Sequence, residues 1–432
     1  MSSKLILKRL EHLHPKYINL NLNRILRLLS DLNNPELILP PIIHVAGTNG
    51  KGSVISFLTK MIEETGLKAH VYTSPHLVKF NERIRINGVI VDDDLLSETL
   101  LEVEKVNNGK KITFFEITTA TAFLIFSRIK SDFLLLEVGL GGRLDATNVI
   151  KKPAASIITS IGFDHQNYLG DTIQKITYEK AGIIKSKCPI ITIKQNKEIN
   201  KIIKMKAKEL NSDLHIIDET ILRNKFPDRS QTIEINGKKI KLPSPSLDGD
   251  HQVDNAALAA SSLFLIRKKI DSICFTKSLM GIKKTHWPAR IQKINNGSLI
   301  EKITRHNNRT IILDGAHNPL GATALKNQLK EYTNVKWLLL FGSLRAKNPA
   351  SFLKIMKNVS NRIIAIQIPN QKDAISAKEI TKVAKEFGFQ SNEADSIEDA
   401  FYMINQTDLS VCICGSLYLA GEILKLNNTI PK

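Results

Sequence analysis

The glycine-rich segment GTNGKGS at residues 47–53 restricts the fold of this chain more than any other feature. It follows a buried-strand pattern at residues 42–46 and leads into a stretch with helical spacing of apolar residues. Glycines let backbone N–H groups converge on phosphate oxygens, and the helix N-terminus adds a favourable dipole. We therefore expect a phosphate cradle, with Lys51 reaching the β- and γ-phosphates, made by Gly47, Thr48, Asn49, Gly50, Lys51, Gly52 and Ser53.

This segment departs from the standard P-loop, because it is shorter and Gly52 separates Lys51 from Ser53. A plain glycine turn is the alternative interpretation. The order strand, Gly, Lys, Gly, Ser and helix favours nucleotide binding.

Short β-rich runs alternate with amphipathic stretches along the chain, which predicts α/β layers around a mainly parallel sheet. The expected strands are 42–46, 69–72, 133–138, 155–160 and 189–193, and the expected helices between them are 51–64, 115–129 and 172–184. Two Asn-Gly pairs, at 87–88 and 236–237, lie between alternating runs and predict peripheral hairpins.

The periodicity fades over residues 271–298 and then restarts, which predicts a domain boundary there. The second series has expected strands at 310–314, 336–341, 362–367 and 409–414, and expected helices at 321–331, 350–358, 377–387 and 417–424. We expect an α/β fold in two parts: a P-loop-type nucleotide-binding domain with a parallel sheet over 1–288, and a smaller C-terminal Rossmann-like α/β domain over 289–432.

The formal net charge of +19 is compatible with a nucleic-acid partner or with anionic small substrates. The lysines are scattered, and no basic block or RNA-binding aromatic motif accompanies them, so we expect no nucleic-acid partner. No apolar run is long enough to span a bilayer, and the N-terminus lacks a signal-peptide pattern. These features predict a cytoplasmic protein without membrane contact, and we expect a monomer.

The four cysteines do not form a spaced disulfide framework. Cys412 and Cys414 could suggest a metal site, but no second Cys or His pair stands nearby. A core strand is the preferred interpretation of this segment.

The motifs together resemble the folylpolyglutamate synthase and dihydrofolate synthase branch of the Mur ligase superfamily. Besides GTNGKGS, the resemblance is carried by SPHL at 74–77, EVGLGGRLDATN at 137–148, SIGFDHQNYLG at 160–170, EKAGI at 179–183, DGDHQVDNAA at 248–257, DGAHNP at 314–319 and GSLYLAGE at 415–422. The spelling GGRLDATN is similar to that of bifunctional bacterial members.

Acidic and imidazole side chains lie at the ends of two apolar strands, at positions where a parallel sheet presents ligand-binding groups. Glu137 ends the run DFLLLEV, and Asp164-His165 follows the next apolar strand. A hard cation on ATP prefers such oxygen donors. A solvated loop histidine is the alternative for His165. The resemblance implies that Ser74, Glu137 and His165 are the protein ligands of two Mg²⁺ ions.

Further roles are implied only by the resemblance. Asp314, Asn255 and Arg290 match positions that contact ATP, although PAR at 288–290 replaces the more usual PGR. His317 matches a histidine near the glutamate site, whereas capping of the following helix explains Asn318 alone. Lys180, in EKAGI, matches a lysine that related ligases carry carbamylated by CO₂.

The expected pterin-side residues fall into three groups. The first group lies within INLNLNRI at 18–25, for which a plain amphipathic helix is the alternative. The second group opens the expected helix 115–129, and the third lies within GGRLDATN. These groups are Asn21, Leu22, Asn23 and Arg24; Phe115, Glu116, Ile117 and Thr118; and Leu144, Asp145 and Ala146.

The resemblance implies an ATP-dependent ligase that joins L-glutamate to dihydropteroate and to tetrahydrofolates through an acyl phosphate. Alternatives are a folylpolyglutamate synthase without the dihydropteroate activity, and another amide ligase of the Mur superfamily. A cell-wall Mur ligase would need a UDP-binding domain before the P-loop, for which the preceding segment is too short. A nucleotide-dependent switch without ligase chemistry would leave the Asp314 and His317 motif unexplained.

Overall fold

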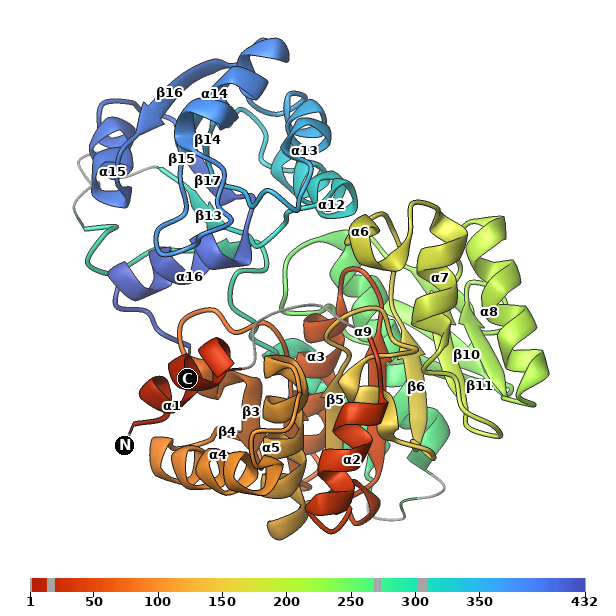
Figure 1. Ribbon diagram of the computed structural model, residues 1–432. Coiled ribbons are helices and arrows are strands. Elements are labelled where there is room, and N and C mark those ends of the chain that lie inside the picture. The colour runs from red at the N-terminus through yellow and green to blue at the C-terminus, as the bar shows by residue number, and fades with distance from the viewer. Residues whose placement is uncertain (1, 14–19, 268–269, 271–272, 302–308, 432) are drawn as a thin grey trace.

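The computed structural model describes residues 2–13, 20–267, 270, 273–301 and 309–431. Residues 18 and 19 of the expected pterin-side segment and residues 271 and 272 of the expected boundary lie outside this part. Figure 1 shows two lobes, each built on its own mainly parallel sheet, with the blue C-terminal lobe standing above the rest. The expected α/β fold class is confirmed.

The first lobe is centred on an eight-stranded sheet. Its strands in spatial order are β4 (Val89–Ile90), β3 (Ile84–Ile86), β2 (Ala69–Tyr72), β5 (Phe133–Glu137), β1 (Ile42–Ala46), β6 (Ala155–Ile158), β7 (Ile190–Ile193) and β8 (Leu214–Ile217). The six strands from β2 to β8 are parallel, and β3 and β4 add an antiparallel edge. Because β1 pairs with β5 and β6, all five of its residues are buried.

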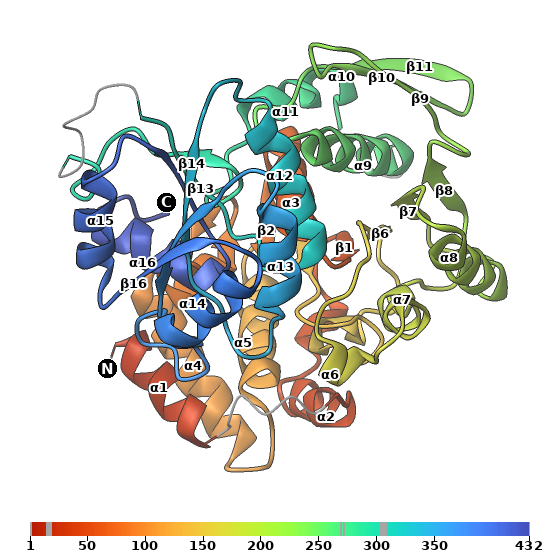
Figure 2. The ribbon, with the colours of Figure 1, turned by 90° about the horizontal axis from the view of Figure 1, so that it is seen from above.

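Helices cover both faces of this sheet. One face packs against α3 (Lys51–Glu63), α9 (Asp250–Ile266) and α11 (Met280–Lys284), and α10 (Phe275–Ser278) lies beside α11 and α3. The other face packs against α1 (Ser3–Leu13), α2 (Asn23–Asp31), α4 (Asp93–Asn107), α5 (Phe114–Arg128), α7 (Ile173–Ala181) and α8 (Lys197–Glu209). Short helical turns are η1 (Pro35–Leu37), η2 (Phe80–Arg83), η3 (Ala146–Val149) and α6 (Gln166–Leu169). Figure 2 shows this layering from above.

Both expected Asn-Gly hairpins are present. Asn87 and Gly88 connect β3 to β4, and Asn236 and Gly237 connect two strands of a small antiparallel sheet, with positive φ at all four residues. That sheet consists of β9 (Leu222–Lys225), β10 (Gln231–Ile235) and β11 (Lys238–Leu242).

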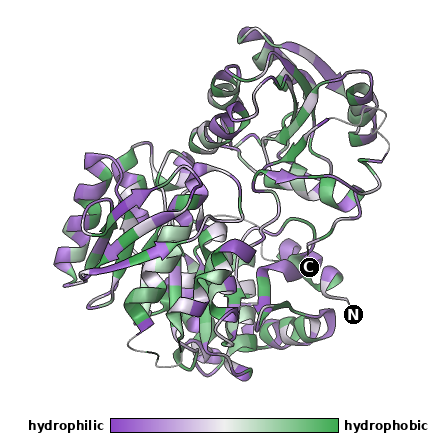
Figure 3. Ribbon diagram, turned by 180° about the vertical axis from the view of Figure 1, so that it is seen from behind, coloured by the Kyte–Doolittle hydropathy of each residue, from purple (hydrophilic) through white to green (hydrophobic). Residues whose placement is uncertain are grey.

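The second lobe is a six-stranded sheet between two helical layers. Its strands in spatial order are β12 (Gln292–Lys293), β13 (Ile311–Leu313), β17 (Ser410–Cys414), β14 (Trp337–Phe341), β15 (Arg362–Ile366) and β16 (Gln390–Ala394), and only β12 is antiparallel to its neighbour. One face packs against α12 (Pro319–Lys330), α13 (Pro349–Met356) and α14 (Ala377–Glu386), and the other against α15 (Ile397–Asn405) and α16 (Leu417–Leu426). In Figure 3 the outer helices mix purple and green, as one-sided burial requires.

Three elements of this lobe are not among the expected strands and helices: the two-residue strand β12, strand β16 and helix α15. Strand β16 escapes prediction because its residues are mostly polar and exposed, so no alternating apolar pattern marks this edge strand. Helix α15 has a buried stripe at Ile397, Ala400, Phe401 and Ile404 and a capping Ser396, a pattern that does predict a helix. Cys412 and Cys414 lie in the buried strand β17, as expected.

The chain passes from the first lobe to the second between α11 and β12, a segment that includes the expected boundary at residue 288. Within the described part of the chain, no helix is long and apolar enough to cross a membrane.

The central strands should dominate stability. Leu135 lies in the middle of β5 and is fully buried, so Leu135→Ala should lower the free energy of unfolding by about 2–5 kcal/mol. Leu37 is 66% exposed, so Leu37→Ala should change it by less than about 0.5 kcal/mol. Urea unfolding of both variants measures the difference, and equal effects would contradict the assigned core.

Candidate functional site

The glycine-rich loop leaves the buried strand β1 and enters α3, as expected. Its backbone is held by the neighbouring loop after β6, since Thr48 N donates to Ser160 O at 2.8 Å and Thr159 Oγ1 donates to Asn49 O at 2.6 Å. The loop therefore has a fixed shape at the carboxyl edge of the parallel sheet.

An added Cβ would clash at each of the three loop glycines, including Gly52, where it would lie 2.8 Å from Trp287 Nε1. At Gly47 (φ 149°) an added Cβ would lie 1.8 Å from Thr159 Oγ1, and at Gly50 (φ 89°) it would lie 2.6 Å from Asn255 Oδ1. Both also have a positive φ that side chains disfavour. Gly47 and Gly50 thus allow both the close contact with neighbouring side chains and the positive φ of the loop backbone.

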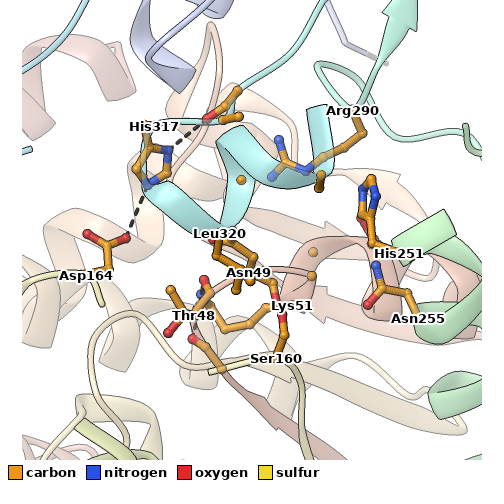
Figure 4. Close-up of a pocket in the computed structure, with 18 of the residues that line it drawn as sticks. Thr48, Asn49, Lys51, Ser160, Asp164, His251, Asn255, Arg290, His317 and Leu320 are labelled. Atoms are coloured by element: carbon orange, nitrogen blue, oxygen red, sulfur yellow. Dashed lines mark hydrogen bonds and ion pairs between the residues drawn. The ribbon is translucent and has the colours of Figure 1, made fainter. Parts of the chain in front are cut away.

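The loop lines a cavity of about 330 Å³ between the two lobes. This volume lies within the range of small-molecule sites. Figure 4 shows Thr48, Asn49 and Lys51 on one side of it and Arg290 and His317 on the other. The cavity thereby gathers residues that are more than 200 positions apart in the sequence.

Lys51 is held above the loop by its own backbone. Its Nζ donates to Gly47 O and Thr48 O, both at 3.2 Å, and lies 3.9 Å from Glu137 Oε1. The other carboxylate oxygen of Glu137 accepts from Ser74 N at 3.1 Å. Burial raises the pKa of Glu137, and the nearby Lys51 opposes that rise.

Ser53 presents an oxygen with unused bonding capacity. The residue is 1% exposed, and its Oγ has no hydrogen-bond partner among the described residues, although it lines the same cavity as Ser74 and Glu137. A buried hydroxyl without a hydrogen-bond partner costs free energy unless a bound ligand supplies the partner. These oxygens therefore fit a hard divalent cation together with phosphate.

His165 faces the same cavity from the loop after β6. Burial lowers the pKa of its imidazole to about 3, and Lys347 adds to the effect. A neutral imidazole is the form that binds a metal. Its Nε2 lies 3.2 Å from Lys347 Nζ, and no three His, Cys, Asp or Glu side chains cluster as a metal site within the described residues. The ligand set Ser74, Glu137 and His165 stays a prediction.

Asp164 joins the two lobes. Its carboxylate forms an ion pair with Lys347, lies 3.4 Å from His317 Nε2, and accepts from Asn318 Nδ2 at 3.1 Å. Burial opposes its ionisation, but the contacts with His317 and Lys347 outweigh burial and hold its pKa well below the usual range. Asn318 also caps α12 and hydrogen-bonds the Asn49 side chain at 2.9 Å.

Asp314 and Arg290 lie where the chain enters the second lobe. The two carboxylate oxygens of Asp314 accept from Ile291 N and Ala316 N, each at 2.7 Å, so this side chain organises backbone as well as lining the cavity. Burial lowers the pKa of Arg290, against the attraction of Asp314 and Glu137. Asn255, on α9, also lines this side of the cavity, and its side chain leaves no room for a Cβ at Gly50.

Lys180 lies in the last turn of α7, within the helix expected over 172–184. It is 5% exposed and its Nζ donates to Gly47 O at 2.9 Å. Burial, together with the nearby charge of Lys51, lowers the pKa of Lys180 to about 7. The ammonium is therefore directed at the phosphate loop and easily deprotonated.

The expected pterin-side groups meet one another but do not line this cavity. Arg24 forms a two-point ion pair with Glu116, at 2.9 Å for both contacts, and the ring of Phe115 packs under Gly139. Asp145 is buried and accepts from Leu140 N at 2.8 Å. Leu22, Leu144 and Asn21 are half-buried, Asn23 is exposed, and Ala146 is buried.

Ile117 and Thr118 are placed in the core. Both side chains are fully buried, and Thr118 Oγ1 donates to Phe114 O at 2.9 Å within α5. The sequence places them beside Phe115 and Glu116, but helical periodicity turns them toward the sheet.

Sequence reasoning missed Lys347 as a site residue and did not commit Asp164 to a role. Lys347 follows β14 at the carboxyl edge of the second sheet, and this position was the available signal. Only tertiary structure brings it to Asp164, which is 183 positions away.

Known proteins resemble this chain over both lobes. The family model of the Mur ligase middle domain matches residues 45–263, and that of the dihydrofolate synthetase C-terminal domain matches residues 297–426. A dihydrofolate synthase/folylpolyglutamate synthase from Bacillus subtilis is 32% identical over 94% of both chains. The chain belongs to the dihydrofolate and folylpolyglutamate synthase family of Mur ligases.

Other members of the family agree. A dihydrofolate synthetase from Saccharomyces cerevisiae is 31% identical and covers 95% of this chain and 99% of its own. The structure of E. coli FolC in complex with DHPP and ADP has a TM-score of 0.86 at 26% identity and covers 99% of this chain and 98% of that one. A bifunctional relative with Mn, AMPPNP and L-glutamate bound has a TM-score of 0.84 at 27% identity, with 98% of both chains covered. This chain is therefore an ATP-dependent ligase of the same family.

The buried lysine predicts a specific pH dependence of stability. The pKa of Lys180 is about 7 in the folded chain, whereas an unfolded lysine titrates near 10.4. Between these values the unfolded chain binds the extra proton, so this residue makes the unfolding free energy rise with pH. From pH 7 to 9 the difference between wild type and Lys180→Met should grow by about 2 kcal/mol in favour of wild type.

Urea unfolding in CO₂-free buffer at pH 7, 8 and 9 measures this difference. A parallel pH dependence of the two proteins would show that Lys180 keeps an ordinary pKa.

Proposed function

We propose that the protein ligates L-glutamate to dihydropteroate and to tetrahydrofolates, with ATP as the energy source. The observation that carries this proposal is the single cavity in which the phosphate loop of the first lobe faces His317 and Arg290 of the second. The ligands bound in the related structures, which include DHPP, ADP, AMPPNP and L-glutamate, support the same substrate classes.

The reaction requires two successive displacements. A substrate carboxylate oxygen attacks the γ-phosphorus of ATP and ADP leaves. The amine nitrogen of glutamate then attacks the acyl carbon, phosphate leaves, and the departing phosphate can take the amine proton. Lys51 and Arg290 face the cavity as cations, so they balance the charge on the transferring phosphoryl group.

The structure favours a binding role for His317. Its Nδ1 lies 2.8 Å from Gly315 O and its Nε2 lies 3.4 Å from Asp164 Oδ2, so both nitrogens face oxygen acceptors. The longer contact of Nε2 leaves this nitrogen able to donate to a substrate carboxylate in place of Asp164. We assign His317 and Lys347 to the entering glutamate, whose carboxylates suit hydrogen-bond donors and cations.

Ser74, Glu137 and His165 would hold the divalent metal, and we retain the proposal of two Mg²⁺ ions. Bound there, the metal would supply charge neutralisation for the phosphates. Ser53 Oγ, buried without a partner among the described residues, would complete the oxygen donors.

We further propose that Lys180 is carbamylated by CO₂. Carbamylation needs a neutral amine, and the lowered pKa of Lys180 supplies one near neutral pH. The addition would form a bond between Nζ and the carbon of CO₂ with loss of one proton, and it would replace a cation that faces the metal site by an anion.

The pterin would lie on the side of Phe115 and the Arg24–Glu116 pair. These residues come from α2 and α5 and meet beside the glycine loop at 139–142. A folylpolyglutamate synthase without dihydropteroate activity is the second candidate, because relatives named for either activity match this chain at similar identity.

An assay of ATP-dependent phosphate release tests the function. Purified protein with glutamate and dihydropteroate, and separately with glutamate and tetrahydrofolate, should release phosphate in both cases. Release with tetrahydrofolate alone would support the second candidate, and release without either pteroate-type acid would contradict both.

Lys51→Ala should lower kcat by about 100-fold or more, because it removes a cation from the transferring phosphoryl group. The fold should be retained, since the Lys51 side chain is 18% exposed and its ammonium contacts loop carbonyls and Glu137 rather than the core. Lys60→Ala, on the same helix but half-buried away from the cavity, is the matched control. Comparable activity of the two folded variants would overturn the phosphate-loop assignment.

Lys180→Ala should lose activity, and acetate should restore part of it by supplying a carboxylate in the vacated space. Mass spectrometry of wild type under CO₂ should show the added carboxylate. Full activity of Lys180→Ala without acetate would remove the carbamylation proposal.

A further inference from the structure

The linker between the lobes carries backbone strain on both sides of Arg290. Ala289 has a φ of 55° and Ile291 a φ of 49°, in the left-handed region. Most other non-glycine residues with positive φ in the described part of the chain are Asn, which tolerates this conformation. A β-branched isoleucine there is an outlier, and such strain persists only where the surroundings hold it.

Three hydrogen bonds hold this turn. The Ala289 amide donates to Gln292 Oε1 at 2.9 Å, and the Ala289 carbonyl accepts from Gly315 N at 3.0 Å. The Ile291 amide donates to Asp314 Oδ2 at 2.7 Å. The Gln292 side chain therefore holds the strained Ala289 in place, and we call its hydrogen bond to the Ala289 amide the clamp.

Packing holds the same turn from two directions. Ala289 is fully buried in the core on the α15 and α16 face of the second sheet, and Ile291 is 2% exposed in the core on the opposite face. The Ile291 Cδ1 also lies 3.0 Å from where a Cβ on Gly249 of the first lobe would stand. Rotation of the turn would withdraw one side chain from its core.

The consequence concerns the direction of the Arg290 side chain. Its Nη1 donates to the Ala289 carbonyl at 2.9 Å, and the residue lines the cavity that holds Lys51 and Glu137. No described carboxylate forms an ion pair with it. The turn thus directs the Arg290 guanidinium into the cavity, where it can bind an anionic ligand (Figure 4).

We propose that Gln292 is a positioning residue for nucleotide binding: its side chain stabilises the left-handed conformation of Ala289, and this turn directs Arg290 at the phosphates. The inference rests on the proposed contact between Arg290 and ATP. It predicts that glycine at position 289, which adopts positive φ without steric cost, makes the clamp unnecessary.

The test measures binding of AMPPNP with Mg²⁺ by calorimetry, beside thermal unfolding. Gln292→Leu should raise the dissociation constant about fivefold, because the strained turn is released. Adding Ala289→Gly to Gln292→Leu should restore the wild-type affinity, whereas Ala289→Gly alone should leave it unchanged and raise the unfolding midpoint. Gln328→Leu, the same change at a half-buried position of α12, is the control and should leave affinity unchanged.

In an Arg290→Ala background, Gln292→Leu should cause no further loss of affinity. Unchanged affinity in Gln292→Leu, or a loss that Ala289→Gly fails to restore, would overturn the proposal. If Arg290→Ala itself binds the analogue normally, the proposed role of Arg290 fails, which is a separate outcome from failure of the clamp.

Discussion

The alignment of parallel strands β5, β1 and β6 is the constraint on which the rest of the site depends. Their carboxyl ends meet at one edge of the sheet. Glu137 at the end of β5, the phosphate loop after β1 and Asp164 after β6 therefore line one cavity. The apolar residues of these strands exclude water from the sheet, so the polar groups that follow can lie only at its edge. The phosphate loop keeps its shape because Thr159 and Ser160 of the neighbouring strand end hold its backbone.

The second lobe completes what the first lobe cannot provide. Its own parallel sheet ends in loops that carry Asp314, His317 and Lys347, and the Asp164 carboxylate accepts contacts from two of them. A buried carboxylate requires such partners, since an unpaired charge away from water is strongly unfavourable. The contact between the lobes is therefore both structural and part of the cavity that we assign to ATP and glutamate.

The cavity brings charges of both signs together. Lys51, Lys180 and Arg290 line it, Lys347 lies beside it, and burial lowers the pKa of Lys180 to about 7. Four carboxylates, those of Glu137, Asp164, Asp254 and Asp314, line it as well. Such an arrangement suits a polyanionic substrate that binds together with metal ions.

The amino-acid sequence by itself determined the α/β class, both Asn-Gly hairpins, most strands and the phosphate loop, because each depends on local periodicity or on glycines in a short segment. It also predicted Glu137 and His165 as candidate metal-binding residues, since each lies at the end of an apolar strand or just after one. Tertiary structure alone decided the partnership of Asp164 with Lys347, the inward direction of Ile117 and Thr118, the lowered pKa of Lys180 and the strained turn at Arg290. These features depend on burial and on contacts between segments far apart in the chain, and a linear pattern carries no information on either.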